Sequence, residues 1–188
     1  MLYEYLKEHI LKSPYKKLIS ANENVTYYDF IMYTELCGKH LEDGKYGILC
    51  NSKLNTVKAL FACFVSKNPV VVFPHDYENN YIKTITDNIS LSHIITDNGI
   101  IKVSDNKNKP ENLNNTALII YFTGLCGEQE SIILSEENLI SDINTAFDNP
   151  NIIPDNIIIS HSLNQYKNSI KNLLIAFVRG KNIIFNDD

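Results

Sequence analysis

Apolar residues recur along this chain with two alternating periods, one typical of helices and the other of strands. Recurrence every three or four positions indicates a helix, and a short run that is apolar throughout indicates a buried strand. The pattern predicts helices over 2–12, 27–41, 54–66, 77–90, 136–147 and 166–178. It predicts strands over 46–52, 69–73, 93–97, 117–123, 131–134, 156–160 and 182–185. This alternation predicts an α/β fold, a mostly parallel sheet with helices on both faces.

The second predicted helix is introduced by Thr26, a residue type that favours the N-cap position. Apolar side chains recur through it at helical spacing: Phe30, Tyr33, Leu36, Cys37 and Leu41. Its aromatic residues are Tyr27, Tyr28, Phe30 and Tyr33. Because of the helical spacing, we expect these aromatic side chains in the core rather than in an aromatic binding box.

One polar stretch, "SDNKNKPENLNN", interrupts the alternation of helices and strands after residue 103. Its Asn, Lys and Pro residues are typical of a linker. It is too short to separate two independent domains, so we expect a single α/β domain over 1–188. The alternative is a pair of sub-lobes, 1–105 and 116–188, joined by a polar linker over 106–115.

Composition and charge exclude several functional classes. The 188 residues are 44% hydrophobic and 21% charged, as in ordinary globular proteins. A net charge of -5 argues against nucleic-acid binding, which needs clustered basic residues. No apolar run reaches the roughly 18 residues of a membrane span, so none is expected. The four cysteines form no CxxC pair and have no histidine at metal-ligand spacing, which predicts reduced core thiols, no metal site and a cytoplasmic location.

The most informative stretch is "ALIIYFTGLCGEQES" at 117–131, a buried strand that runs into a loop with two glycines. The following "IILSEENLI" reads as a second strand and a helix capped by Ser135. This order resembles the phosphate-binding signature of the adenylate-forming superfamily: acyl-CoA synthetases, luciferases and the adenylation domains of nonribosomal peptide synthetases. Tyr121, Thr123, Gly124 and Gly127 match that signature in place.

The resemblance extends over nearly all of the chain. "VTYYDFIMYTELCGKHL" is similar to an early helix of the family, and "YGILCNSKLNTVKALFACFVSKNPVVVFP" to its strand, helix and strand unit. "IISHSLNQYKNSIKNLLIAFVRGKNIIF" resembles the segment that lines the acyl pocket, with His161 at the position of the pocket residue. The resemblance therefore implies the first part of the family's N-terminal domain. Without it, His161 reads as a histidine at a strand end that bonds to the main chain.

The departures from the family signature fall on its chemistry. Phe122, Leu125 and Cys126 replace hydroxyl residues, and Glu130 stands where the family has a lysine that contacts phosphate. A carboxylate there turns an attraction of about 4 kcal/mol, at about 4 Å and an effective dielectric near 20, into a repulsion of similar size. We therefore expect no ATP binding of the family type, and ATP with magnesium only if the loop is functional. The alternative for the two glycines is a tight turn with no ligand.

Three functional hypotheses follow. The first is a truncated, degenerate AMP-binding-enzyme-like domain that acts as a binding or scaffolding module. It has no catalytic residue of its own, because the family's magnesium, ribose and catalytic-lysine motifs would fall after residue 188. The second is the N-terminal or split part of an ATP-dependent acyl or aminoacyl adenylate-forming ligase. The third is an unrelated small α/β domain. A protein partner or a homodimer is expected, since half of a larger lobe would leave apolar surface exposed.

Overall fold

The computed structural model describes residues 1–74, 79–104, 115–123, 129–147, 154–164 and 169–186. The helices in this part are α1 (Leu2–Leu11), α2 (Tyr27–Lys39), α3 (Lys53–Ser66), α4 (Asn79–Ile89), α5 (Glu136–Phe147) and α6 (Lys171–Val178). The strands are β1 (Lys17–Ile19), β2 (Asn24–Thr26), β3 (Tyr46–Leu49), β4 (Val70–Val72), β5 (His93–Thr96), β6 (Gly99–Lys102), β7 (Thr116–Thr123), β8 (Gln129–Ser135), β9 (Asn156–Ile159) and β10 (Asn182–Phe185).

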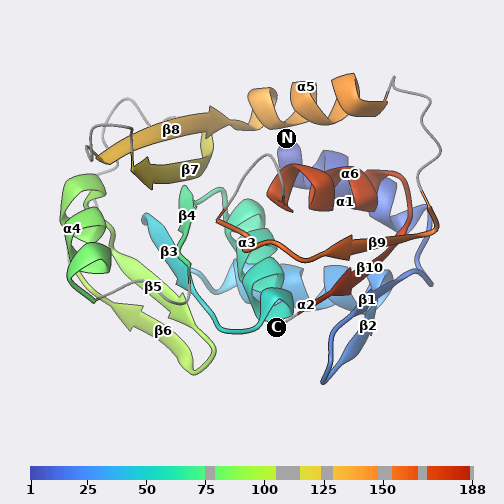
Figure 1. The fold of residues 1–188 in the computed structure, drawn as a ribbon, viewed down its shortest axis with the longest axis horizontal. Coiled ribbons are helices and arrows are strands. Elements are labelled where there is room, and N and C mark those ends of the chain that lie inside the picture. Colours follow the sequence, from blue (N-terminus) through green and yellow to red (C-terminus); the bar gives the residue numbers. More distant parts are fainter. Residues whose placement is uncertain (75–78, 105–114, 124–128, 148–153, 165–168, 187–188) are drawn as a thin grey trace.

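The strands form two sheets (Figure 1). The larger has the order β6-β5-β3-β4-β7-β8, and the smaller has the order β2-β1-β10-β9. Strands inside both sheets are parallel, whereas β2, β6 and β8 pair antiparallel at the edges. The predicted α/β fold with mostly parallel strands is confirmed. The expectation of one sheet is wrong, because β9 and β10 pair with β1 rather than with the strands before them in sequence.

Helices cover both faces of the larger sheet, as the continuous apolar strands predict. Side chains alternate between the faces of a strand. Val70 and Val72 of β4 point into the main core, which they share with α3. Val71 lies in a second apolar cluster with Ile82 and Ile85 of α4. Figure 1 accordingly shows α3 between the two sheets and α4 on the outer side of the larger one.

The starts of α2, α3 and α5 follow from capping residues that the sequence displays. The Thr26 side chain accepts a hydrogen bond from the main-chain N–H of Asp29, which confirms the predicted cap of α2. Ser135 does the same for Asn138 at the start of α5, at 3.1 Å. Helix α3 begins after Ser52, whose hydroxyl accepts from the N–H of Asn55 at 3.4 Å.

Three short strands were not predicted from the apolar pattern. β1 and β2 have three residues each, too few to show a period, and they form a hairpin. β6 pairs antiparallel with β5 across a turn that ends at Gly99, where φ is +131°. Asn98-Gly99 between two apolar runs is a strong hairpin signal and predicts this turn.

The outer face of α2 differs from the expectation. Tyr27 and Phe30 are buried as predicted, but Tyr28 is 54%, Tyr33 is 49% and Leu36 is 61% exposed. The buried stripe contains instead Ile31, Thr34 and Gly38, beside Tyr27 and Phe30. Gly38 selects this stripe because its missing side chain lets α3 approach: a Cβ at Gly38 would lie 2.7 Å from the main-chain oxygen of Ala62.

The predicted linker over 106–115 falls largely outside the described residues. Each sheet contains strands from both sides of this segment. The domain boundaries, 1–188 or two sub-lobes, remain a prediction. Among the helices that the structure describes, none combines the length and the apolar character that a membrane crossing requires.

Candidate functional site

The predicted phosphate loop connects two strands that form an antiparallel hairpin. Pairing runs from Thr116 opposite Ser135 to Thr123 opposite Gln129. This hairpin is the β8 edge of the larger sheet. Gly124 and Gly127 lie outside the described residues, so their predicted role in an anion-binding turn stays a prediction.

Tyr121 and Glu130 lie on the two arms of this hairpin. The Tyr121 side chain is half-buried, and its hydroxyl accepts a hydrogen bond of 3.0 Å from the side-chain amide of Asn88 on α4. Glu130 is the second residue of β8, opposite Phe122 in the register, and is exposed. The hairpin thus presents a carboxylate to solvent at the end from which the loop departs.

His161 lies elsewhere in the fold. It is exposed and follows Ile159, the last residue of β9, by two positions. β9 is parallel to β10, so His161 comes directly after the carboxyl end of a parallel strand, where α/β folds place ligands. The preceding strand β9 belongs to the smaller sheet, however, whereas Tyr121 lies on β7 of the larger one. Its predicted contact with an acyl group remains a prediction.

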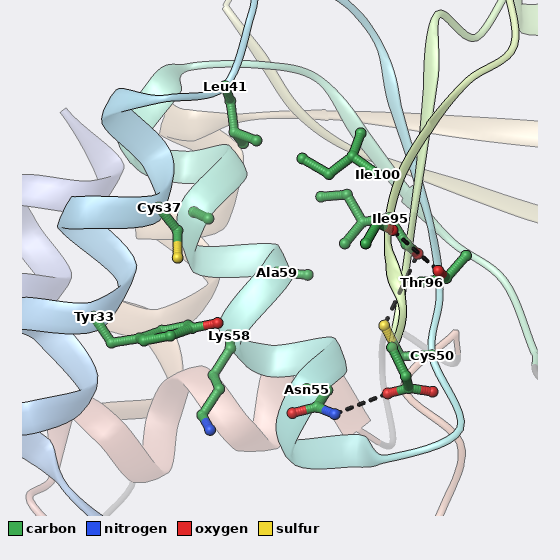
Figure 2. A pocket seen from close by; sticks show the side chains of 13 residues that line it. Tyr33, Cys37, Leu41, Cys50, Asn55, Lys58, Ala59, Ile95, Thr96 and Ile100 are labelled. Carbon is green, nitrogen blue, oxygen red and sulfur yellow. Dashed lines mark hydrogen bonds between the residues drawn. The ribbon is translucent and has the colours of Figure 1, made fainter.

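A pocket of about 260 Å³ that the sequence did not predict lies between α2, α3 and the β5–β6 hairpin (Figure 2). Its apolar lining is formed by Leu41, Ala59, Ala62, Ile95 and Ile100. Its other lining residues are Tyr33, Cys37, Cys50, Asn55, Lys58, Thr96, Asp97 and Gly99. The β5–β6 hairpin, which was not predicted from the sequence, forms one wall of the pocket. The Asn98-Gly99 turn is the sequence signal that would have indicated this hairpin.

The charged groups of this pocket are already paired within the protein. Lys58 Nζ lies 2.7 Å from Glu23 Oε2 and 5.2 Å from the centre of the Tyr33 ring. The Asp97 carboxylate accepts hydrogen bonds from the Asn55 side chain at 2.8 Å and from the main-chain N–H of Asn51 at 2.7 Å. The pocket therefore has an apolar wall and a polar rim whose charges are neutralised or hydrogen-bonded.

The pocket thiols have different degrees of burial. Cys50 is buried and Cys37 is half-buried, and both are free, as is the buried Cys63. Burial, with a smaller effect of the nearby Asp97 carboxylate, raises the pKa of Cys50 to about 12. The Cys50 thiol is therefore neutral near pH 7 and a poor nucleophile. Cys50 and Cys63 lie in the core as predicted, Cys37 is only half-buried, and Cys126 lies outside the described residues.

The part of the chain that the structure describes contains no cluster of three or more His, Cys, Asp or Glu residues that could hold a metal ion.

No protein-family model matches the sequence, and no curated protein matches it. Solved structures do match. O-succinylbenzoate coenzyme A synthetase (MenE) from Bacillus subtilis, in complex with ATP and magnesium, matches with a TM-score of 0.76 and 15% identity, over 97% of this chain and 57% of that one. The N-terminal domain of FACL13 from Mycobacterium tuberculosis matches with a TM-score of 0.79 and 10% identity, over 100% of this chain and 57% of that one. A luciferase-like enzyme from Zophobas morio matches with a TM-score of 0.77 and 14% identity, over 98% of this chain and 53% of that one.

The chain has the adenylate-forming fold. It corresponds to the N-terminal part of that fold and spans somewhat more than half the length of these three matched chains. The predicted resemblance is confirmed at the level of the fold. Almost the whole chain superposes on these structures, which shows a shared fold.

The β7–β8 hairpin has no cationic residue that could contact the phosphates of ATP, which the matched MenE structure holds together with magnesium. Residues 116–135, which cover both strands and the loop, contain no lysine, arginine or histidine. Glu130 adds a negative charge at the end of the hairpin, and the Tyr121 hydroxyl, which accepts a hydrogen bond from Asn88, is a neutral group. A triphosphate needs cationic side chains or N–H donors, and no described side chain of this hairpin is cationic.

Proposed function

We propose that this chain is an AMP-binding-enzyme-like domain with a degenerate phosphate loop, which does not bind ATP in the family manner and acts as a binding or scaffolding module. The fold supports the family-like architecture, and the charge of the β7–β8 hairpin supports the loss of nucleotide binding.

The observation that carries this proposal is the position of Glu130. It is exposed at the start of β8, where the resemblance places a lysine that contacts phosphate. Exchange of a lysine for a carboxylate at about 4 Å changes the interaction with phosphate by about 8 kcal/mol at an effective dielectric near 20. Screening by solvent and by magnesium reduces this figure. Even half of it corresponds to roughly a thousandfold in affinity.

A second candidate is the N-terminal part of an adenylate-forming ligase whose remaining residues are supplied elsewhere. The coverage of the matched chains favours it, since 43 to 57% of several MenE and FACL13 chains superpose on this one. Such a ligase would still need phosphate contacts from its own β7–β8 loop. Glu130 therefore favours the first candidate.

Isothermal titration with Mg-ATP and with AMP tests the proposal. We expect no binding heat from the unaltered chain up to about 1 mM nucleotide. Any binding would then be weaker than a free energy of about -4 kcal/mol. Micromolar binding by the unaltered chain would contradict the proposal and support the ligase.

Two variants refine the titration. Glu130→Lys restores the cation at the position of interest, and Glu137→Lys makes the same charge change at an exposed position on α5. Binding gained by Glu130→Lys alone means that the loop keeps an anion-binding main chain and has lost only its charge. Equal gains from both variants would mean that net charge, rather than position 130, controls binding.

A further inference from the structure

The outer face of α2 carries an apolar stripe that faces solvent. Tyr28 is 54%, Met32 is 50% and Leu36 is 61% exposed, and they are spaced four residues apart. Residues at this spacing lie above one another on one side of a helix. Tyr33, 49% exposed, widens the stripe.

This apolar surface continues beyond α2. Tyr33 and Ile100 line the same pocket from opposite sides, and Ile100 on β6 is 51% exposed. Figure 2 shows Tyr33 on the helix and Ile100 on the β5–β6 hairpin across the pocket from it. Contiguous apolar surface of this kind is typical of an interaction site rather than of free surface.

Charged residues at the two ends of the stripe have opposite signs. Asp29 lies in the first turn of α2 and Lys39 in the last, and both are exposed. Ten residues of helix separate them by about 15 Å. Glu35, between them, forms an ion pair with Lys7 of α1, so its charge is compensated within the chain.

This arrangement is complementary to itself. If a second α2 packs antiparallel about a two-fold axis level with position 34, Asp29 faces Lys39 of the other copy and Met32 faces Leu36 of the other copy. Each contact then occurs twice, as a two-fold interface requires. A parallel arrangement would instead bring Asp29 against Asp29 of the other copy, which is repulsive.

We propose that the outer face of α2 is a homodimer interface, in which two copies pack antiparallel through Met32 and Leu36 and are aligned by pairs of Asp29 with Lys39. The occupant is a second copy of this chain. Along α2 the residues run acidic, apolar, basic, and this order is complementary in charge to the same order read in reverse. The inference does not depend on whether the β7–β8 loop binds nucleotide.

Sedimentation velocity over a concentration series tests the proposal. We expect the unaltered chain to dimerise and Leu36→Glu to weaken the dimer at least about tenfold, since it puts a charge at the centre of the contact. Ile158→Glu is the matched control: Ile158 is 64% exposed, on β9. A monomeric unaltered chain at about 100 μM overturns the proposal. So does a dimer that Ile158→Glu disrupts and Leu36→Glu does not.

Charge reversal tests the antiparallel alignment. Asp29→Lys and Lys39→Asp should each weaken the dimer about tenfold, because each creates two pairs of like charge. The double variant should restore dimerisation to near the unaltered level, since both pairs are then reversed together. Asp29→Lys also removes the acceptor of a 2.6 Å hydrogen bond from Thr26, so thermal unfolding of each variant must show a folded protein. Loss of dimer in the double variant, with the fold intact, overturns the alignment.

Discussion

Tyr27 donates its hydroxyl to the main-chain oxygen of Lys181 and thereby joins the first residue of α2 to the residue before β10. The side chain is fully buried, and its ring centre lies 5.1 Å from that of Phe177. Tyr27→Phe keeps the ring but leaves the oxygen of Lys181 without this donor. We expect a loss of about 1 kcal/mol in the free energy of unfolding, measured by urea titration. Tyr15→Phe, at a position 87% exposed, should leave the unfolding midpoint unchanged.

The same residue predicts a loss of stability in alkali. Burial raises the pKa of Tyr27 well above its ordinary value of 10. The unfolded chain therefore releases the Tyr27 proton above pH 10 while the folded chain keeps it, so the free energy of unfolding falls as the pH rises past 10. The slope contributed by one such group is about 1.4 kcal/mol per pH unit. Unfolding curves from pH 9 to 11 should show a smaller slope for Tyr27→Phe, and an equal slope would mean that Tyr27 titrates normally.

Gly38 is expected to be intolerant of a side chain despite its helical position. A Cβ there would lie 2.5 Å from Val65 Cβ and 2.7 Å from the main-chain oxygen of Ala62, both on α3. Replacement of an unconstrained helical glycine by alanine stabilises a helix by about 1 kcal/mol. We expect Gly38→Ala to destabilise the protein by about 1 to 3 kcal/mol, because α2 must move away from α3. Thermal unfolding decides the sign, and a stabilised variant would show that α3 moves aside easily.

Cys50 should resist alkylation in the folded protein. Its pKa of about 12 leaves about a thousandfold less thiolate at pH 8 than an ordinary cysteine has. Treatment with iodoacetamide followed by peptide mass spectrometry should find Cys50 unmodified until the protein is denatured. Modification at the rate seen in urea would instead indicate that the pocket opens frequently.

The sequence predicted those elements that have a period long enough to read. The helices and the buried strands β3, β4 and β7 were predicted from local spacing, and the caps at Thr26 and Ser135 were predicted from residue type. Pairing was not predictable in this way, because nothing local shows that β9 and β10 join β1 rather than the larger sheet. The choice between the two apolar stripes of α2 was also wrong, since it depends on the close approach of α3 at Gly38.

The candidate site was predicted unevenly for similar reasons. Tyr121 and Thr123 lie on the predicted strand, because an apolar run bounded by glycines is a local signal. Glu130, predicted in the loop, lies on β8, which begins two residues earlier than predicted. The binding roles of these residues stay predictions. His161 was placed correctly at the end of a strand. Which sheet that strand joins could not be predicted, because it depends on pairing between strands that are far apart in the sequence. The pocket beside Tyr33 was missed because its walls come from three elements and one of them, β6, was not recognised.

The parallel pairing of β1 with β10, in which Leu18 lies opposite Ile183, has a consequence for synthesis on the ribosome. The hairpin of β1 and β2 can form early, but β1 cannot meet β10 until the residues up to Phe185 have been translated. At common rates of elongation this interval is roughly ten to thirty seconds. During that time the unpaired main-chain edge of β1 is available to chaperones and to neighbouring nascent chains. The smaller sheet therefore closes later than the larger one, whose last strand in sequence is β8.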